Sequence, residues 1–272
     1  MMQYLAEMFS YPFMVRALVV GILISLCAAL LGVSLVLKRY SMIGDGLSHV
    51  GFGALAVASA LNLAPLAVAI PVVILAAFVL LRLSESGKIK GDAAIAVFST
   101  GALAIGVMVV SLSTGMNADL NSYLFGSILA MSKQDVVLSV ALSAAVLILY
   151  IFFYDKIFAV TFDENFARAT GIATGVYNTL LAVLTAVVVV LGMRMMGALL
   201  ISSLIVFPAL TSMRIFKSYR SVIISSVVLA VVSFALGMGF SFLYGTPAGA
   251  SIVVVDMILF MFCSAVSWVR ER

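Results

Sequence analysis

Long apolar runs without a single charge dominate this sequence and restrict it to one kind of fold. The stretches from Ala17 to Leu37 and from Gly197 to Met213 contain no charged residue. A helix needs about 20 apolar residues to cross a bilayer, and in lipid a helix satisfies its own backbone hydrogen bonds. Charged residues make up only 10% of the chain, too few to cover a water-facing globule. The sequence therefore predicts an all-α polytopic transmembrane helical bundle.

Nine segments fit as membrane spans, and an eight-span arrangement with one run re-entrant or interfacial is the second choice. The nine expected spans cover about 13–37, 44–62, 65–83, 92–113, 135–154, 175–192, 196–213, 221–244 and 248–269. Asn62 and Pro65 separate the second span from the third, while Gly192 and Gly197 flank a very short connection. The segment 117–131, apolar but interrupted by polar residues, is a candidate for a short outer helix.

Basic residues gather on one side of this expected bundle. With the N-terminus outside and alternating spans, the inside segments hold Lys38, Arg39, Arg82, Lys88, Lys90, Lys156, Arg168, Arg214, Lys217, Arg220, Arg270 and Arg272, and the outside holds Arg16, Lys133 and Arg194. This bias follows the positive-inside rule. We therefore expect an external N-terminus, a cytoplasmic C-terminus and a single transmembrane domain over residues 1–272. Because basic residues sit at span ends, the net charge of +4 does not indicate a nucleic-acid partner.

One inside segment, at about 155–175, has helical character of its own. Asp163 and Glu164 stand where a helix start favours acids, and Gly171 stands where a C-terminal cap favours glycine. The sequence predicts a short cytoplasmic helix here. A solvated linker without a helix is the alternative.

Asp45 and the single histidine of the chain, His49, fall at the head of the second expected span. Residues four apart on a helix share a face, and a carboxylate with an imidazole suits a divalent transition metal. A helix-end Asp beside a partly wetted His is the alternative interpretation. Four glycines, Gly44, Gly46, Gly51 and Gly53, surround the pair. They indicate either close helix packing or room for an ion path.

Asp256 lies in the middle of the ninth apolar run. A charged group inside a membrane is costly and therefore needs a partner. It either faces an ion path or pairs with Arg194 or with a hydroxyl group, and the sequence leaves this choice open.

Several enzyme motifs are missing from the sequence. It contains no G-x-x-x-x-G-K-[ST] phosphate loop and no H-E-x-x-H zinc-protease motif. With one histidine, a catalytic zinc site of the multi-histidine type cannot form within one chain. We therefore expect no enzymatic activity of its own and no permanently bound cofactor.

The chain resembles the permease subunits of the zinc/manganese type of ABC importers. The matching segments, in chain order, are LKRYSMIGDGLSHVGFGALA (37–56), YLFGSIL (123–129) followed by Asp135, FDENFARATGI (162–172), GALLISSLIVFPALTSMRI (197–215) and GTPAGASIVVV (245–255). Together, in register with the expected spans, they are specific to that family.

The resemblance implies a mechanism and a set of partners. It implies a multi-pass protein of the prokaryotic cell membrane, surrounded by lipid, that acts with a second permease copy, two cytoplasmic ATP-binding subunits and an extracellular metal-binding protein. Asp45 and His49 match the family's intramembrane metal ligands. The family's ATPase-docking segment corresponds in this chain to Phe162, Asp163, Glu164, Ala167, Arg168 and Gly171.

The transported metal and the depth of its site are the open points of this resemblance. Some manganese importers carry Pro-Gly shortly after the histidine, whereas this chain has Gly-Phe-Gly at 51–53, which favours Zn²⁺ over Mn²⁺ or Fe²⁺. A helix starting near Gly44 places the pair only about 2–8 Å from its start, so a deep site requires either that the preceding loop dips inward or that the span edges lie elsewhere. A secondary transporter or channel that acts alone, using Asp45, His49 and Asp256 as a relay, is the alternative function.

Overall fold

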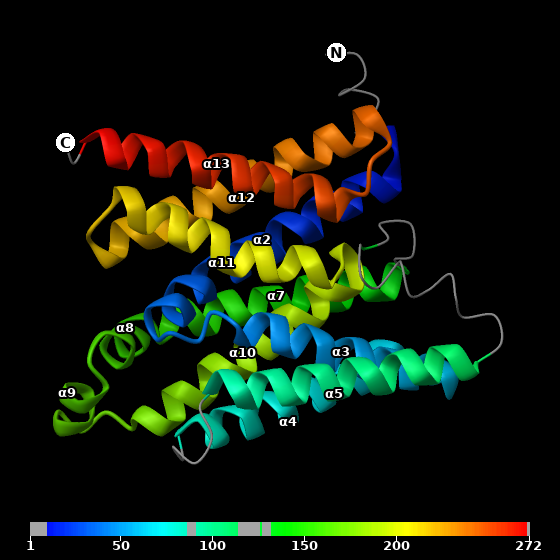
Figure 1. The fold of residues 1–272 in the computed structure, drawn as a ribbon, viewed down its shortest axis with the longest axis horizontal. Helices are drawn as coiled ribbons and strands as arrows, with labels where there is room; N and C mark the ends of the chain where they lie inside the picture. The colour runs from blue at the N-terminus through cyan, green and yellow to red at the C-terminus, as the bar shows by residue number, and fades with distance from the viewer. Residues whose placement is uncertain (1–9, 86–90, 114–125, 127–131, 271–272) are drawn as a thin grey trace.

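The long helices of this chain lie side by side along one axis of the molecule (Figure 1). The computed structural model describes residues 10–85, 91–113, 126 and 132–270, and no strand occurs in these ranges. The helices are α2 (Pro12–Leu37), α3 (Ile43–Ala60), α4 (Pro65–Glu85), α5 (Gly91–Leu112), α7 (Lys133–Phe152), α8 (Tyr154–Phe162), α9 (Glu164–Ala169), α10 (Thr174–Met196), α11 (Ala198–Ile215), α12 (Tyr219–Tyr244) and α13 (Ala248–Arg270).

The predicted polytopic helical bundle is confirmed. Each of the nine expected spans coincides with a long helix, and eight helices of the described residues are long and apolar enough to cross a membrane. The remaining long helix is α3, which carries Asp45, His49 and several glycines. The count of nine expected spans and the count of eight apolar helices therefore differ by α3 alone. The expected outer helix at 117–131 lies outside the described residues, apart from Gly126. The sidedness of the bundle stays a prediction.

The boundary between α10 and α11 differs from the expected one. The sixth span was expected to end at residue 192, but α10 continues to Met196. The chain turns only at Gly197, whose φ of 90° is readily accessible to glycine. Gly192 stays helical, and a Cβ there would lie 2.5 Å from the Cδ1 of Ile201 on α11. One glycine therefore makes the turn, and the other lets the two helices pack closely after it.

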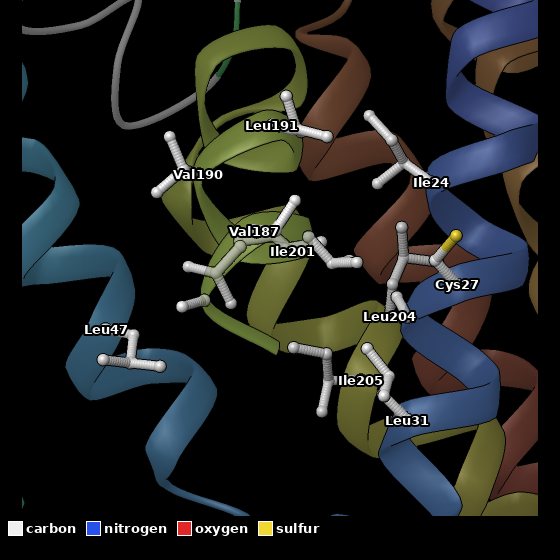
Figure 2. Close-up of a cluster of buried hydrophobic side chains, with 14 of the residues drawn as sticks. Ile24, Cys27, Leu31, Leu47, Val187, Val190, Leu191, Ile201, Leu204 and Ile205 are labelled. Atoms are coloured by element: carbon white, nitrogen blue, oxygen red, sulfur yellow. The ribbon is translucent and has the colours of Figure 1, made fainter. Parts of the chain in front are cut away.

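The centre of the bundle is an apolar core shared by α2, α10 and α11, with a contribution from α3. Figure 2 shows side chains of these helices meeting, namely Ile24, Cys27, Leu31, Leu47, Val187, Val190, Leu191, Ile201, Leu204 and Ile205. All of them are buried. Lipid provides no hydrophobic driving force between helices, so such close packing is itself the main attraction within a membrane bundle.

The turn after α2 sends the chain back along that helix. Lys38 caps α2, and Arg39 adopts a left-handed conformation with a φ of 62°. The amide of Tyr40 then donates to the carbonyl of Leu35 over 2.8 Å, as in the turn that commonly ends helices. The loop that leads to α3 therefore folds inward.

As a result, α3 begins inside the bundle instead of level with the end of α2. An added Cβ on Gly32 of α2 would meet the backbone of Ile205, and one on Gly44 of α3 would meet its side chain. Both glycines thus lie at one level of α11. Gly32 precedes the last residue of α2 by five positions, so α3 starts about 8 Å inward of that end. Of the two arrangements compatible with a deep site, the inward dip of the loop is the one observed, and the depth of the pair in a membrane stays a prediction.

The glycines of α3 lie at helix contacts. A Cβ on Gly53 would lie 2.6 Å from the carbonyl oxygen of Ala102, and one on Gly46 would lie 2.5 Å from the Cγ2 of Ile95, both on α5. Gly51 faces Met193 of α10 in the same way. Of the two interpretations of these glycines, close helix packing is the one with direct contacts.

Candidate functional site

Asp45 and His49 lie together on one face of α3. The Nε2 of His49 is 3.7 Å from the Oδ2 of Asp45, one helical turn away. Leu47, between them in sequence, is fully buried and points into the core (Figure 2). Because an α-helix rotates by about 100° per residue, both polar side chains point away from that core contact. The expected pair is therefore formed within one helix.

The pair combines a partly exposed carboxylate with a less exposed imidazole. The side chains of Asp45 and His49 are 46% and 24% exposed. The hydroxyl of Ser202 on α11 donates to Oδ1 of Asp45 over 3.4 Å, and that of Ser48 donates to its backbone carbonyl over 2.7 Å. The Nδ1 of His49 is buried and receives no hydrogen-bond partner from the described residues. One carboxylate oxygen and one ring nitrogen thus face each other on an open side of the helix.

This spacing is compatible with a shared metal ion. Two ligands each about 2.1 Å from a tetrahedral ion lie about 3.4 Å apart, close to the 3.7 Å between the Asp45 and His49 atoms. Within the described residues, no group of three or more His, Cys, Asp or Glu side chains could hold a metal. The pair can therefore supply two ligands, and any further ones have to come from elsewhere.

Asp256 is an acidic group in the middle of the long apolar helix α13. It is 3% exposed on α13, and the hydroxyl of Ser203 on α11 donates to its Oδ2 over 3.0 Å. The sequence left Arg194 or a hydroxyl group as the partner of Asp256, and the structure shows a hydroxyl group, that of Ser203. Ser203 follows Ser202, which reaches Asp45. Consecutive residues of α11 therefore contact two different carboxylates, one on α3 and one on α13.

The segment at about 155–175 forms two short helices, α8 and α9, where the sequence indicated one. Asp163 lies extended between them and accepts a hydrogen bond from the amide of Phe166 over 2.9 Å, so it caps α9. At the other end Gly171 has a φ of 85°, and the amide of Ile172 donates to the carbonyl of Ala167 over 3.0 Å. The predicted start and end signals of a helix are confirmed, and the alternative of a bare linker is wrong.

The residues of this segment face different ways. Phe162 and Phe166 are 62% and 66% exposed and Arg168 is also exposed, whereas Ala167 is buried. Glu164 instead turns toward the bundle, where it accepts a hydrogen bond from Nζ of Lys38 over 3.3 Å. Exposed aromatic rings are enriched in surfaces that another protein covers.

A groove runs between α9 and the start of α10. It has a volume of about 660 Å³ and is lined by Arg82, Arg168, Ile172, Ala173, Thr174, Gly175, Val176 and Thr179. Two arginines from different helices, Arg82 of α4 and Arg168 of α9, thus border this hollow.

Sequence reasoning missed Lys38 and Asn178. The Nζ of Lys38 donates to Oδ1 of Asn178 over 2.6 Å, and both side chains are at least partly buried. The sequence places Lys38 at the end of a span, where a lysine ordinarily meets water and marks orientation. Asn178 carries no motif signal at all.

This bundle, with its short helix pair α8 and α9, resembles the membrane subunits of ABC transporters. Residues 10–267 match the sequence profile of the ABC 3 transport family. The chain therefore belongs to that family, and it is a multi-pass protein of the prokaryotic plasma membrane.

Named relatives cover nearly the whole chain. The manganese transport system membrane protein MntC of Halalkalibacterium halodurans is 28% identical over 93% of this chain and 87% of its own length. The high-affinity zinc uptake system membrane protein ZnuB of Haemophilus influenzae is 29% identical, over 90% and 94%. A probable iron transport system membrane protein of the same organism is 29% identical over the full length of both.

A solved structure has the same fold. The chain matches PsaBC from Streptococcus pneumoniae in complex with Fab with a TM-score of 0.86 and 28% identity, covering 96% of this chain and 94% of that one. A second match, an inward-facing putative metal-chelate type ABC transporter, has a TM-score of 0.74 at 13% identity and supports the fold alone.

Proposed function

We propose that this chain is the transmembrane permease subunit of an ATP-driven importer of a divalent transition metal, and that Asp45 and His49 bind the metal during transport. The observation that carries the proposal is the pair itself. Two metal-ligating side chains lie 3.7 Å apart on one face of α3. That helix begins about 8 Å inward of the end of α2. Family membership adds that such chains serve transport.

The exposure of the pair favours a second permease copy. In a bilayer, a carboxylate and an imidazole cannot face lipid, so they have to face water or protein. Each chain supplies one Asp and one His, and two copies supply four ligands, the number of a tetrahedral site. A homodimer with the two α3 faces opposed therefore completes what one chain leaves unfinished.

Zn²⁺ is our first choice for the metal, with Mn²⁺ and Fe²⁺ as alternatives. Carboxylate oxygen and imidazole nitrogen suit all three ions, so selection also depends on geometry and availability. The named relatives serve manganese, zinc and iron. The Gly-Phe-Gly sequence at 51–53 is the feature of this chain that favours zinc.

Cytoplasmic ATP-binding subunits are the partners that we assign to the α8–α9 segment. We propose that the exposed rings of Phe162 and Phe166 and the guanidinium of Arg168 form the docking surface, together with the groove beside them. Asp163 and Gly171 shape α9, and Ala167 anchors it. ATP hydrolysis then belongs to the partner chain, and an extracellular binding protein delivers the metal.

Asp256 is our candidate for a second acidic group along the ion path. Its carboxylate contacts Ser203, the neighbour of the residue that reaches Asp45. A shift of α11 therefore moves both contacts at once.

The test of the metal site is the metal content of the purified permease–ATPase complex. We expect one Zn²⁺ per two permease copies in the wild type and none in His49→Ala, because two ligands of four are lost. Asp45→Asn should also lose the ion. Val57→Ala, on the same helix beyond the pair, is the matched control and should keep it. Normal metal content in His49→Ala would count decisively against the site.

A secondary transporter or channel is the second candidate function, because Asp45, His49 and Asp256 are three ionisable groups along long helices. The two candidates differ in one requirement. The ABC permease needs an ATPase to move metal, and the stand-alone transporter does not.

A further inference from the structure

Lys38 is a buried lysine at the end of α2. Its side chain is 8% exposed, and its Nζ donates to three oxygens. The acceptors are Oδ1 of Asn178 on α10 at 2.6 Å, Oε2 of Glu164 on α9 at 3.3 Å and the carbonyl of Val160 on α8 at 3.2 Å. A buried charge is tolerated when it is paired and hydrogen-bonded, and here each bond goes to a different helix. Lys38 therefore joins α2 to α8, α9 and α10.

Glu164 completes this cluster from the cytoplasmic side. Its Oε2 also accepts from Nδ2 of Asn178 over 3.3 Å, and its Oε1 accepts from Arg168 over 3.2 Å. Burial by itself raises the pKa of Glu164, but the hydrogen bond from Asn178 and the charge of Lys38 outweigh it, so the pKa lies below its ordinary value. Glu164 therefore stays ionised at neutral pH, and the Lys38 cluster, consisting of Lys38, Glu164 and Asn178, is not a switch for protons.

The position of Lys38 along the chain gives the cluster its importance. The next residue, Arg39, makes the left-handed turn that sends the loop inward to α3. Asp45 follows only seven positions after Lys38. The cytoplasmic helices are thus hydrogen-bonded to the very residue from which the chain leaves for the metal pair.

We propose that Lys38 is a positioning residue that couples α8 and α9 to the metal-binding end of α3. This inference rests on the proposed function. A displacement of α9 pulls Glu164, and the charge-assisted bonds to Lys38 carry the displacement to the turn at Arg39 and so to Asp45. Lys38 touches no metal in this scheme. It sets where Asp45 stands when the ATPase changes state.

The test compares Lys38→Met with Lys156→Met in the complete permease–ATPase complex. Lys156 is an exposed lysine on α8, so its replacement removes the same charge without touching the cluster. The first readout is hydrogen exchange in residues 39–45, with and without trapping by ATP and vanadate. The second is the amount of Zn²⁺ moved per ATP hydrolysed in proteoliposomes.

We expect trapping to alter the hydrogen exchange of residues 39–45 in the wild type and in Lys156→Met. In Lys38→Met we expect trapping to leave that exchange unchanged. The Zn²⁺-to-ATP ratio of Lys38→Met should fall about tenfold, within the range typical of coupling between sites, while ATPase binding and hydrolysis persist. A cluster with only a structural role would lower thermal stability and leave the ratio unchanged. The proposal is overturned if Lys38→Met has the same Zn²⁺-to-ATP ratio as the wild type and the same change in exchange on trapping.

Two further outcomes are decided in the same experiment. If Lys38→Met does not assemble, Lys38→Arg keeps the charge but changes the geometry of the three bonds, and a wild-type ratio in that variant also overturns the link. If the wild-type complex moves no metal, the proposed function fails, and the exchange response of residues 39–45 still decides whether Lys38 couples α9 to α3.

Discussion

Asp45, Lys38 and Asp256 show three ways in which an apolar bundle accommodates an ionisable side chain. Asp45 stays partly exposed on a helix face beside His49, which leaves it able to bind an ion. Lys38 is buried but donates to three oxygens. Asp256 is buried with a serine hydroxyl as a hydrogen-bond donor. Because an unpaired charge in a membrane is costly, the exposed pair is the one that calls for an additional partner.

Replacing Asp256 separates its charge from its hydrogen bond. Asp256→Asn keeps an oxygen that accepts from Ser203 and removes the charge. We expect several-fold slower Zn²⁺ uptake with unchanged metal content, because in our proposal the residue lies along the path and not at the pair. Uptake assays and metal analysis on the same preparation check this. Ser203→Ala, which removes the donor, serves as the companion variant. Wild-type uptake in Asp256→Asn would leave Asp256 with a packing role alone.

At the residue scale, the sequence reveals contacts that are local and conceals those that are distant. Asp45 and His49 are one helical turn apart, so their proximity follows from the period of a helix. The partners of Lys38 lie 122 to 140 positions away along the chain. No spacing rule reaches that far, and the lysine is indistinguishable in sequence from an ordinary span-end cation.

Among the elements, α9 depends most on single residues because it is only six residues long. Short helices are marginal by themselves, so its capping bonds decide whether it keeps its shape. Asp163 supplies the bond at the start, and Gly171 makes the turn at the end. The docking surface that we propose for α9 therefore depends on both residues.

Removing the cap should loosen α9 and weaken the ATPase contact. Asp163→Ala loses a bond worth about 1 kcal/mol, whereas Asp163→Ser retains an oxygen that can accept it. We expect faster hydrogen exchange in residues 164–170 and poorer co-purification of the ATPase for the alanine variant only. Equal behaviour of the two variants would mean that the cap does not matter for docking.

The contact between α3 and α5 offers a second test at this scale. Gly53→Ala adds a methyl group 2.6 Å from the carbonyl oxygen of Ala102, so the helices have to separate. Overpacking of this kind costs about 1–3 kcal/mol. We expect a lower unfolding temperature in detergent than for Gly101→Ala, whose added methyl meets no atom within 4 Å. Identical melting of the two variants would argue against close packing as the role of Gly53.

Element positions follow from the sequence better than element ends do. Apolar length placed a helix in each of the nine expected ranges because the bilayer sets that length. The end of α10 was misplaced because glycine signals both turns and close packing, and Gly192 serves packing while Gly197 makes the turn. The sequence did not reveal the break between α8 and α9. Aspartate is common both in the first turn of a helix and at its N-cap, so the presence of Asp163 does not show which position it occupies.

At the scale of the whole molecule, we propose that one chain is half of a transport path. The chain folds around its own apolar core, yet it presents the side chains of Asp45 and His49 on an open face. The helices α8 and α9, which carry exposed aromatic rings, lie near the C-terminal end of α2. In our proposal a second copy covers the first surface and an ATPase covers the second. The Lys38 cluster lies between them.

Uptake of Zn²⁺ into proteoliposomes, measured for the permease with and without its ATPase, tests the central claim most directly. Competition by Mn²⁺ and Fe²⁺ in the same assay ranks the ions. We predict ATP-dependent uptake that requires the ATPase and disappears in His49→Ala, with Val57→Ala unaffected. Uptake by the permease alone, or undiminished uptake by His49→Ala, would contradict the account.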